Sequence, residues 1–188
     1  MGLLMEKFLL LSCCAPCSCA VIKKLAQEGA DFVVAFYNPN IQPLEEYRKR
    51  CAENKRACEL FGVPFAELEY DCERWRELVN GLENEPERGK RCDVCFEMRL
   101  KRAMEYAREQ GIGAVASVLG VSRYKDLAQV NRAGERASGL TGVPYIHIEG
   151  RKGGMQEMRL ALIEELGLYE QDYCGCKPEA RSRKISAG

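Results

Sequence analysis

The chain has 188 residues, a formal net charge of zero, 46% hydrophobic residues and 30% charged residues. This length allows one domain with a complete hydrophobic core, and this composition is typical of a globular protein. The neutral balance excludes a strongly basic, nucleic-acid-binding surface as the dominant feature, although it permits local basic patches. The unusual number is that of the cysteines, of which there are eleven.

The grouping of the cysteines argues against a secreted disulfide framework. Their number is odd, and they include a CC pair, a CxxC pair and a CxC pair. The N-terminal residues do not resemble a signal peptide, because Glu6 and Lys7 precede only a very short apolar run. No segment approaches the ~18 apolar residues of a membrane span. We therefore expect a cytoplasmic protein whose cysteines bind metal or perform redox chemistry.

Strands and helices are predicted to alternate along the chain. Short apolar runs predict strands at residues 8–12, 31–37, 63–70, 114–119 and 143–148. Helical periodicity and glycine stops predict helices at residues 20–28, 44–61, 72–82, 93–110, 125–137 and 155–166. This alternation predicts an α/β fold with a mainly parallel five-stranded sheet and helices on both faces. We expect residues 1–176 to form a single domain and residues 177–188 a polar tail.

The first cysteines follow the first predicted strand directly. Cys13, Cys14, Cys17 and Cys19 are predicted to occupy the loop before the next helix, at the sheet edge where open α/β folds bind ligands. A helix N-terminus lowers the pKa of a nearby thiol, and the thiolate is the form that reacts and binds metal. This loop lacks the glycines of a phosphate-binding turn.

We expect two downstream cysteine pairs, at 92–95 and 174–176, to converge with this loop. Four thiolates can hold a tetrahedral zinc ion or an iron–sulfur cluster. The surplus of thiols therefore indicates a second metal or a redox-active pair. A disulfide within the CxC pair would be strained and easily reduced, which suits electron relay. The other downstream cysteines and the single histidine are interpreted as ordinary core or surface residues: Cys51, Cys58, Cys72 and His147.

Short segments spread over most of the chain match one known family in order and spacing. They are CCAPCS at 13–18, YNPNI at 37–41, EY at 46–47, GLE at 81–83, EP at 85–86, RC at 91–92, CF at 95–96, MRL at 98–100 and YCGC at 173–176. Together they resemble the cobalamin-independent epoxyqueuosine reductases of tRNA queuosine biosynthesis. The chain departs from that family at residues 122–125, Ser-Arg-Tyr-Lys where the family often has Ser-Pro-x-Lys, and matches it loosely over 149–165.

The resemblance implies a fold similar to that of the PP-loop, adenine-nucleotide-hydrolase-like proteins, with the cysteine loop in place of the nucleotide loop. It implies an oxidoreductase that reduces the epoxide in the cyclopentane ring of epoxyqueuosine to the alkene of queuosine, at the tRNA wobble position. It also implies a [4Fe–4S] cluster with a further metal or redox centre beside it, such as one additional iron. The implied partners are a tRNA carrying epoxyqueuosine and an external electron donor.

Residue roles follow from the resemblance as hypotheses. The expected cluster ligands are Cys13, Cys14, Cys92 and Cys95. The expected redox-active pair is Cys174 and Cys176, with Cys17 as a reserve ligand to a second iron. The ring hydroxyls are expected to contact residues that could equally serve only to form a turn and cap a helix: Tyr37, Asn38, Asn40 and Glu46.

A tRNA substrate requires phosphate contacts, and three basic patches are candidates for them. The first patch is on the predicted helix at 44–61: Arg48, Lys49, Arg50, Lys55 and Arg56. The second is on the predicted helix at 93–110: Arg99, Lys101 and Arg102. The third is in the tail: Arg181, Arg183 and Lys184.

Three other functions compete with this interpretation. A PP-loop-type tRNA sulfur-transfer enzyme with an iron–sulfur cluster would need an ATP site, and no Ser-Gly-Gly loop follows the first strand. A non-catalytic zinc protein that binds RNA would contain zinc without iron or sulfide. A thiol–disulfide oxidoreductase acting through Cys92 and Cys95 would be active without any metal.

Overall fold

A computed structural model describes residues 6–176, which fold around one five-stranded sheet. The strands are β1 (Phe8–Ser12), β2 (Phe32–Phe36), β3 (Phe65–Glu67), β4 (Ala114–Ser117) and β5 (Tyr145–Ile146). Their order in the sheet is β3-β2-β1-β4-β5, and every neighbouring pair is parallel. The predicted α/β fold with a parallel sheet is therefore confirmed.

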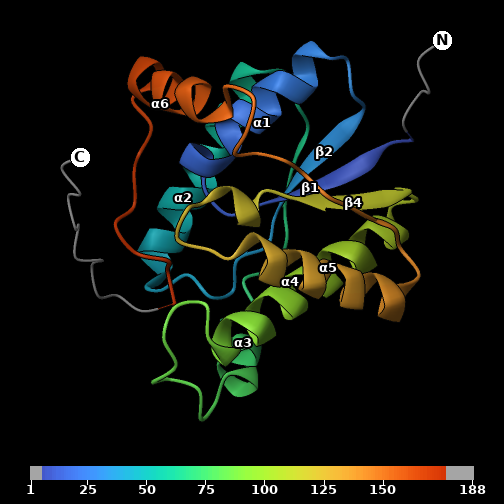
Figure 1. Cartoon of the computed structure of the whole chain (residues 1–188), viewed down its shortest axis with the longest axis vertical. Helices are drawn as coiled ribbons and strands as arrows, with labels where there is room; N and C mark the ends of the chain where they lie inside the picture. Colours follow the sequence, from blue (N-terminus) through green and yellow to red (C-terminus); the bar gives the residue numbers. More distant parts are fainter. Residues whose placement is uncertain (1–5, 177–188) are drawn as a thin grey trace.

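Helices cover both faces of this sheet (Figure 1). The helices are α1 (Ala15–Gln27), α2 (Leu44–Leu60), α3 (Cys72–Leu78), α4 (Lys90–Glu109), α5 (Leu127–Thr141) and α6 (Met155–Leu166), with a 3-10 turn, η1 (Leu119–Val121). Helices α1, α2 and α6 pack against one face, and α4 and α5 pack together against the other.

Strand β1 shows why a continuous apolar run forms the centre of the sheet. Side chains alternate along a strand, so Phe8 and Leu10 pack toward α1, α2 and α6, while Leu9 and Leu11 pack toward α4 and α5. All four are at most 1% exposed. Burial of both faces is what allows a sequence without polar alternation to be a strand.

The position of β1 also fixes where a site can form. Its two neighbours are β2 and β4, so the chain runs outward to β3 on one side and then crosses to β4 and β5 on the other. In open parallel sheets, the loops at such a switch point diverge and leave room for a ligand. The loops after β1, β2 and β4 all emerge at this carboxyl edge.

Two helices begin earlier than the sequence pattern predicted. Helix α1 begins at Ala15 and not at residue 20, so Cys17 and Cys19 lie within the helix. The loop predicted to hold the first cysteines included Pro16, but proline is well tolerated in the first turn of a helix, where its missing N–H would have no intrahelical partner. Helix α4 begins at Lys90, so both Cys92 and Cys95 are helical.

Three other elements are shorter than the sequence pattern predicted. Strands β3 and β5 are shorter than expected, and α3 ends at Leu78 and not at residue 82. Both short strands are at the edges of the sheet, where only one neighbour supplies hydrogen bonds. Among the described residues, no helix is long and apolar enough to cross a membrane. The tail predicted at 177–188, with its basic patch, lies outside the described residues.

Candidate metal and redox site

Three cysteines gather at the junction between β1 and α1. The sulfur atoms of Cys13, Cys14 and Cys17 all lie within 4.8 Å of one another. Cys14 is the N-cap of α1, and its carbonyl accepts the backbone N–H groups of Cys17 and Ser18 at 3.2 Å. No side chain caps the first turn, so these thiols share the positive end of the helix dipole. We call Cys13, Cys14 and Cys17 the first thiol group.

The electrostatics of this group favour one thiolate over the other two. Hydrogen bonds from the thiols of Cys14 and Cys17, together with Arg99 and Lys125, hold the pKa of Cys13 well below its usual value. The hydrogen bond to Cys13 raises the pKa of Cys14 to about 12, and hydrogen bonds to both partners raise that of Cys17. Removal of further protons requires a positive charge to replace them, as a bound metal does.

The other two cysteine pairs form a second thiol group, defined as Cys92, Cys95, Cys174 and Cys176. Cys92 and Cys95 lie on the first turns of α4. Cys176 packs beside Cys95, Trp75 and Val79. A hydrogen bond to Cys174 and burial raise the pKa of Cys176, and burial followed by the charges of Cys174 and Cys95 raises that of Cys92. Two pairs that are far apart in sequence thus share one region.

Lys125 connects the two thiol groups. Its ammonium nitrogen donates to the Cys174 sulfur at 3.1 Å and lies 5.2 Å from the centre of the Phe96 ring. The residue is only 8% exposed. Burial alone would lower the pKa of Lys125, but the charges of Cys174 and Cys13 raise it above its usual value. The structure therefore brings the three cysteine clusters close together, as the sequence predicted.

A narrow pocket lies between the first thiol group and Cys174. Its walls come from the loops after β1, β2 and β4, from α1, α2 and α4, and from residues 168–176, which we call the C-terminal segment: Cys13, Cys14, Cys17, Asn38, Asn40, Ile41, Arg50, Arg99, Ser122, Lys125, Gln171, Tyr173 and Cys174. We call this the cysteine pocket. Three of these side chains are cations, four are cysteines, and none of the described lining residues is a carboxylate.

Arg50 holds the C-terminal segment against the pocket. Its guanidinium donates to the backbone carbonyls of Tyr173 and Cys174 at 3.2 and 3.0 Å, and to the Glu46 carboxylate at 2.6 Å. Gly175 lies against Ile41 with φ +112°, where an added Cβ would meet the Ile41 side chain at 2.9 Å and its Cα at 3.2 Å. Both contacts fix the backbone around the CxC pair.

The residues expected to contact substrate divide into two sets. Asn38 and Asn40 line the cysteine pocket, whereas Tyr37 and Glu46 do not. The Tyr37 side chain is buried in the core between the sheet and α4. Asn38 uses both ends of its amide internally, donating to the Ser12 carbonyl and accepting from Arg99. The Asn40 side-chain oxygen is buried and has no hydrogen-bond partner among the described residues.

Two residues assigned to basic patches are internal, which corrects the prediction for them. Arg50 is 3% exposed and Arg99 is 1% exposed, and both line the cysteine pocket. Arg99 donates to the Tyr37 carbonyl at 3.2 Å and to the Asn38 side chain. Neither guanidinium faces outward to meet phosphates. The charge-dense helices therefore present fewer free cations at the surface than the sequence indicated.

The remaining sulfur and imidazole groups lie away from the pocket. Cys19 and Cys58 are fully buried in the core beneath α1 and α2, and Cys51 packs beside Phe36. The His147 ring lies 3.4 Å from the Glu135 carboxylate, with half of its side chain exposed. Their locations agree with ordinary core and surface roles.

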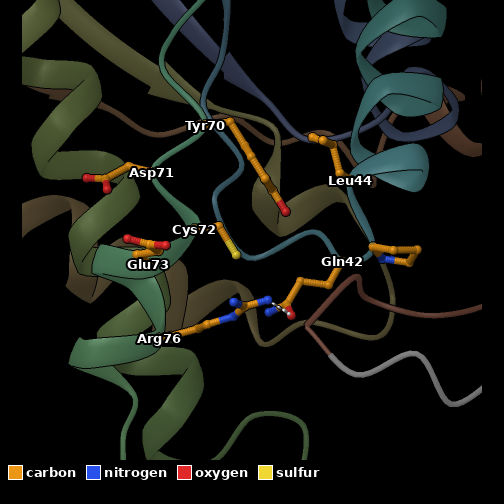
Figure 2. Close-up of a pocket in the computed structure, with 8 residues that line it drawn as sticks. Gln42, Leu44, Tyr70, Asp71, Cys72, Glu73 and Arg76 are labelled. Carbon is orange, nitrogen blue, oxygen red and sulfur yellow. Dashed lines mark hydrogen bonds between the residues drawn. The ribbon is translucent and has the colours of Figure 1, made fainter.

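A larger, open hollow of about 760 Å³ lies between residues 42–44, at the end of the loop after β2, and the first turns of α3 (Figure 2). Arg76 donates to the Gln42 side chain at 2.8 Å across it. The hollow also contains Cys72, but no member of either thiol group. It adjoins the C-terminal segment, because the Tyr173 hydroxyl donates to the Gln42 carbonyl and the Gln42 N–H donates to Gly175.

The residues of the pocket fit a soft metal centre. Thiolates are the preferred ligands of iron–sulfur clusters and of zinc. The nearby cations Arg50, Arg99 and Lys125 offset the negative charge of several thiolates. The space between the side chains is small, about 20 Å³, so the lining would have to open to admit a cluster.

Sequence patterns missed several residues of this site. Arg99 follows Cys92 by seven and Cys95 by four positions on one helix, a spacing that places all three on the same face. That signal was present, but Arg99 was assigned from the sequence to a basic patch for tRNA phosphates. Lys125 was noted only as part of a departure from the family. Gln171 has no local signal, because its contact with Cys14 spans 157 residues of sequence.

The fold resembles that of a solved tRNA-modifying enzyme. U34-tRNA thiolase NcsA from Methanococcus maripaludis, with its [4Fe-4S] cluster, aligns with a TM-score of 0.57. The alignment covers 92% of this chain and 61% of that chain at 15% sequence identity. At this identity the likeness concerns the fold, and it confirms the predicted PP-loop-like architecture.

Sequence comparisons are more specific. The sequence profile described as "Epoxyqueuosine reductase QueH" matches residues 8–181. The chain is 45% identical over 172 residues to epoxyqueuosine reductase QueH of Histophilus somni, covering 91% of this chain and 71% of that relative. It is 44% identical over 172 residues to the Acinetobacter baylyi enzyme, covering 91% and 79%. The chain therefore belongs to the epoxyqueuosine reductase QueH family.

Proposed function

We propose that this protein reduces the epoxide of epoxyqueuosine to the alkene of queuosine at the wobble position of a tRNA. Membership of the family supports the reaction, since the curated relatives are named for it. The observation that supports it most directly is the cysteine pocket, where four cysteines and three cations meet at the switch point of the sheet. A hydrolase or a simple binding protein has no need of this arrangement.

Cys13, Cys14 and Cys17 are the first ligands that we propose for an iron–sulfur cluster, because their sulfur atoms are already within 4.8 Å of one another. Cys92 and Cys95, expected from the sequence to be ligands with Cys13 and Cys14, then supply a fourth thiolate or bind one additional iron. When bound, the cluster supplies electrons one at a time. The fold neighbour with a [4Fe-4S] cluster agrees with a cluster in a fold of this kind.

The reaction breaks both carbon–oxygen bonds of the epoxide, forms a carbon–carbon double bond and releases the oxygen as water. It consumes two electrons and two protons, and an external reductant must supply the electrons. Cys174 and Cys176 remain our proposed redox-active pair, which would store two electrons as dithiol and release them as disulfide. Cys174 is well placed for this role, because it lines the same pocket as the first thiol group.

The tRNA would approach the carboxyl edge of the sheet. Arg48 and Lys49, in the first turns of α2, are exposed near this edge, whereas Arg50 points inward. Lys55 is exposed further along the same helix. The ammonium of Lys49 lies over the Tyr169 ring at 3.3 Å, next to the C-terminal segment. Exposed lysines and arginines of this kind contribute phosphate contacts without sequence preference.

The test uses protein purified without oxygen and reconstituted with iron and sulfide. Iron, sulfide and zinc are measured per chain, and tRNA carrying epoxyqueuosine is then incubated with the protein and dithionite, with and without ATP. We expect iron and sulfide, and conversion of epoxyqueuosine to queuosine in digested tRNA by mass spectrometry, independent of ATP.

Other outcomes would identify the competing functions. Strict dependence on ATP with sulfur incorporation would replace the reductase by a sulfur-transfer enzyme. Stoichiometric zinc without iron or sulfide would leave a structural RNA-binding protein. Disulfide exchange by metal-free protein, without epoxide reduction, would leave a thiol–disulfide oxidoreductase.

A further inference from the structure

Two carbonyl oxygens in the cysteine pocket have no partner among the described residues. They are the side-chain amide oxygens of Asn40 and Gln171, both shielded from solvent. A buried acceptor without a hydrogen bond costs about 1–3 kcal/mol, so a donor from a ligand or an ordered water is expected beside each oxygen. The two residues approach from opposite parts of the chain, the loop after β2 and the C-terminal segment.

The orientation of Gln171 follows from the sulfur beside it. Its amide nitrogen lies 2.9 Å from the Cys14 sulfur and donates to it. A metal-bound thiolate can only accept hydrogen bonds, so the NH₂ end of the amide must face Cys14. The carbonyl end therefore points away from Cys14 and is the end that lacks a partner.

We propose that Gln171 is a positioning residue that contacts both the cluster ligand and the substrate. Its N–H donates to the Cys14 sulfur, and its carbonyl oxygen accepts a hydrogen bond from a hydroxyl of the substrate ring, with Asn40 accepting from a second hydroxyl. This inference rests on the proposed function, which supplies a cyclopentane ring with hydroxyl groups. Gln171 does not exchange electrons or protons itself.

The N–H···S contact has a consequence for the cluster that needs no substrate. Hydrogen bonds to ligand sulfur atoms stabilise the more negative, reduced state and so raise the reduction potential. A hydroxyl that donates to the carbonyl end polarises the amide and strengthens the N–H donor at the other end. Binding of substrate therefore raises the potential further, so that electrons enter more readily once the epoxide is in place.

Two variants separate the two ends of the amide. Gln171→Met keeps a similar length but removes both the donor and the acceptor. Gln171→Glu keeps an oxygen acceptor, removes the N–H donor and adds a negative charge, which also lowers the potential. Gln156→Met is the matched control, because Gln156 is on α6 and does not line the cysteine pocket. Each reconstituted protein is titrated electrochemically while its cluster signal is followed by electron paramagnetic resonance.

Binding is then measured with two RNAs, the tRNA carrying epoxyqueuosine and the same tRNA without the modification. We expect Gln171→Met and Gln171→Glu to have lower cluster potentials than wild type, and Gln156→Met to match wild type. We expect Gln171→Met to weaken binding of the modified tRNA about 5- to 10-fold, as loss of one hydrogen bond does. Gln171→Glu keeps the acceptor, so its binding stays within about twofold of wild type.

An unchanged potential in both variants would overturn the contact with the cluster ligand. An unchanged preference of Gln171→Met for the modified tRNA would overturn the contact with the substrate. If wild-type protein itself binds both RNAs equally, the substrate contact fails, whereas the proposed function is judged separately by conversion of epoxyqueuosine. The reduction potential is measured without RNA, so it tests the N–H···S contact whether or not the substrate contact exists. If Gln171→Met does not assemble a cluster, Gln171→Leu supplies this test, because it also lacks the N–H donor and adds no charge.

Discussion

The two thiol groups are built in opposite ways. The first, Cys13, Cys14 and Cys17, comes from a single five-residue segment at the end of β1 and the start of α1. The second joins the start of α4 to the C-terminal segment, whose described residues, 168–176, form no helix or strand. Local backbone geometry is enough to place the first group. The second depends on long-range contacts, most of all those of Arg50 and Lys125.

This difference in construction is consistent with different roles for the two groups. A preassembled group at a helix N-terminus suits permanent ligands, because little side-chain entropy is lost on binding. A group held by side-chain contacts from several elements can change its arrangement more easily, as a redox-active pair does. The comparison predicts that mutations will affect metal content in one group and turnover or stability in the other.

The largest effect is expected from Cys14→Ala, which removes the central member of the first thiol group. We expect this variant to lose nearly all iron and sulfide and all epoxide reduction, because no other described cysteine lies as close to Cys13 and Cys17. Iron and sulfide analysis with the visible spectrum measures this. Cys58→Ala is the control, since Cys58 is buried in the core away from the pocket. A full cluster in Cys14→Ala would contradict the assignment.

Cys174→Ser tests the second group while leaving the first intact. We expect iron and sulfide contents close to wild type, with conversion of epoxyqueuosine reduced to background, because serine cannot form a disulfide with Cys176. Single-turnover conversion and metal analysis on the same preparation measure both quantities. Cys51→Ser is the control for loss of a buried cysteine outside the pocket. Wild-type turnover in Cys174→Ser would remove the redox role.

Arg50→Ala should disturb the second group through its backbone. It removes two hydrogen bonds to the C-terminal segment and leaves Glu46, only 11% exposed, without its cation. Loss of one partner of a buried pair costs about 3–5 kcal/mol, which corresponds to a fall in Tm of about 10 °C for a chain of this size. Thermal unfolding measures the change.

The exposed pair of Arg74 and Glu77 supplies the control for Arg50. Surface ion pairs contribute about 0–1 kcal/mol, so Arg74→Ala should change Tm very little. Maleimide labelling of Cys174 and Cys176 should accelerate in Arg50→Ala and not in Arg74→Ala. Equal effects of the two substitutions would mean that Arg50 does not hold the C-terminal segment.

The smallest effect is expected from Asp126→Ala. The Asp126 carboxylate caps α5 by accepting the backbone N–H groups of Ala128 and Gln129 at 2.8 and 3.3 Å. Loss of such a cap costs about 1 kcal/mol, or about 2–4 °C in Tm. Helix α5 supports α4 and therefore the second thiol group, so metal content of the first group should not change. A stable variant that lacks its cluster would refute this separation.

The sequence was sufficient for the sheet and for the edge at which the cysteines meet. Apolar runs such as Phe8–Ser12 predict buried parallel strands because they are covered on both faces. Helix starts were less predictable, because Pro16 in a first turn looks the same in sequence as proline in a loop. The short edge strands β3 and β5 depend on pairing that no local pattern shows.

The site was predicted in part, and the missing part consists of buried charge. Arg50 and Arg99 were interpreted as surface cations because charged residues on a helix usually face solvent. Their burial depends on partners from other elements, namely the carbonyls of Tyr173, Cys174 and Tyr37. Gln171 could not have been identified from the sequence, since a lone glutamine in a loop has no pattern. Long-range contacts, rather than local propensity, determine these positions.

The packing of Gly175 against Ile41 limits which residues can occupy position 175 in related proteins. The residue between Cys174 and Cys176 adopts φ +112°, which favours glycine, and an added Cβ would lie 2.9 Å from the Ile41 side chain and 3.2 Å from its Cα. Relatives that keep this approach of the two segments should therefore have glycine between the two cysteines, whatever their surrounding residues. A relative with any other residue there must have moved its loop after β2, and the two changes should be inherited together.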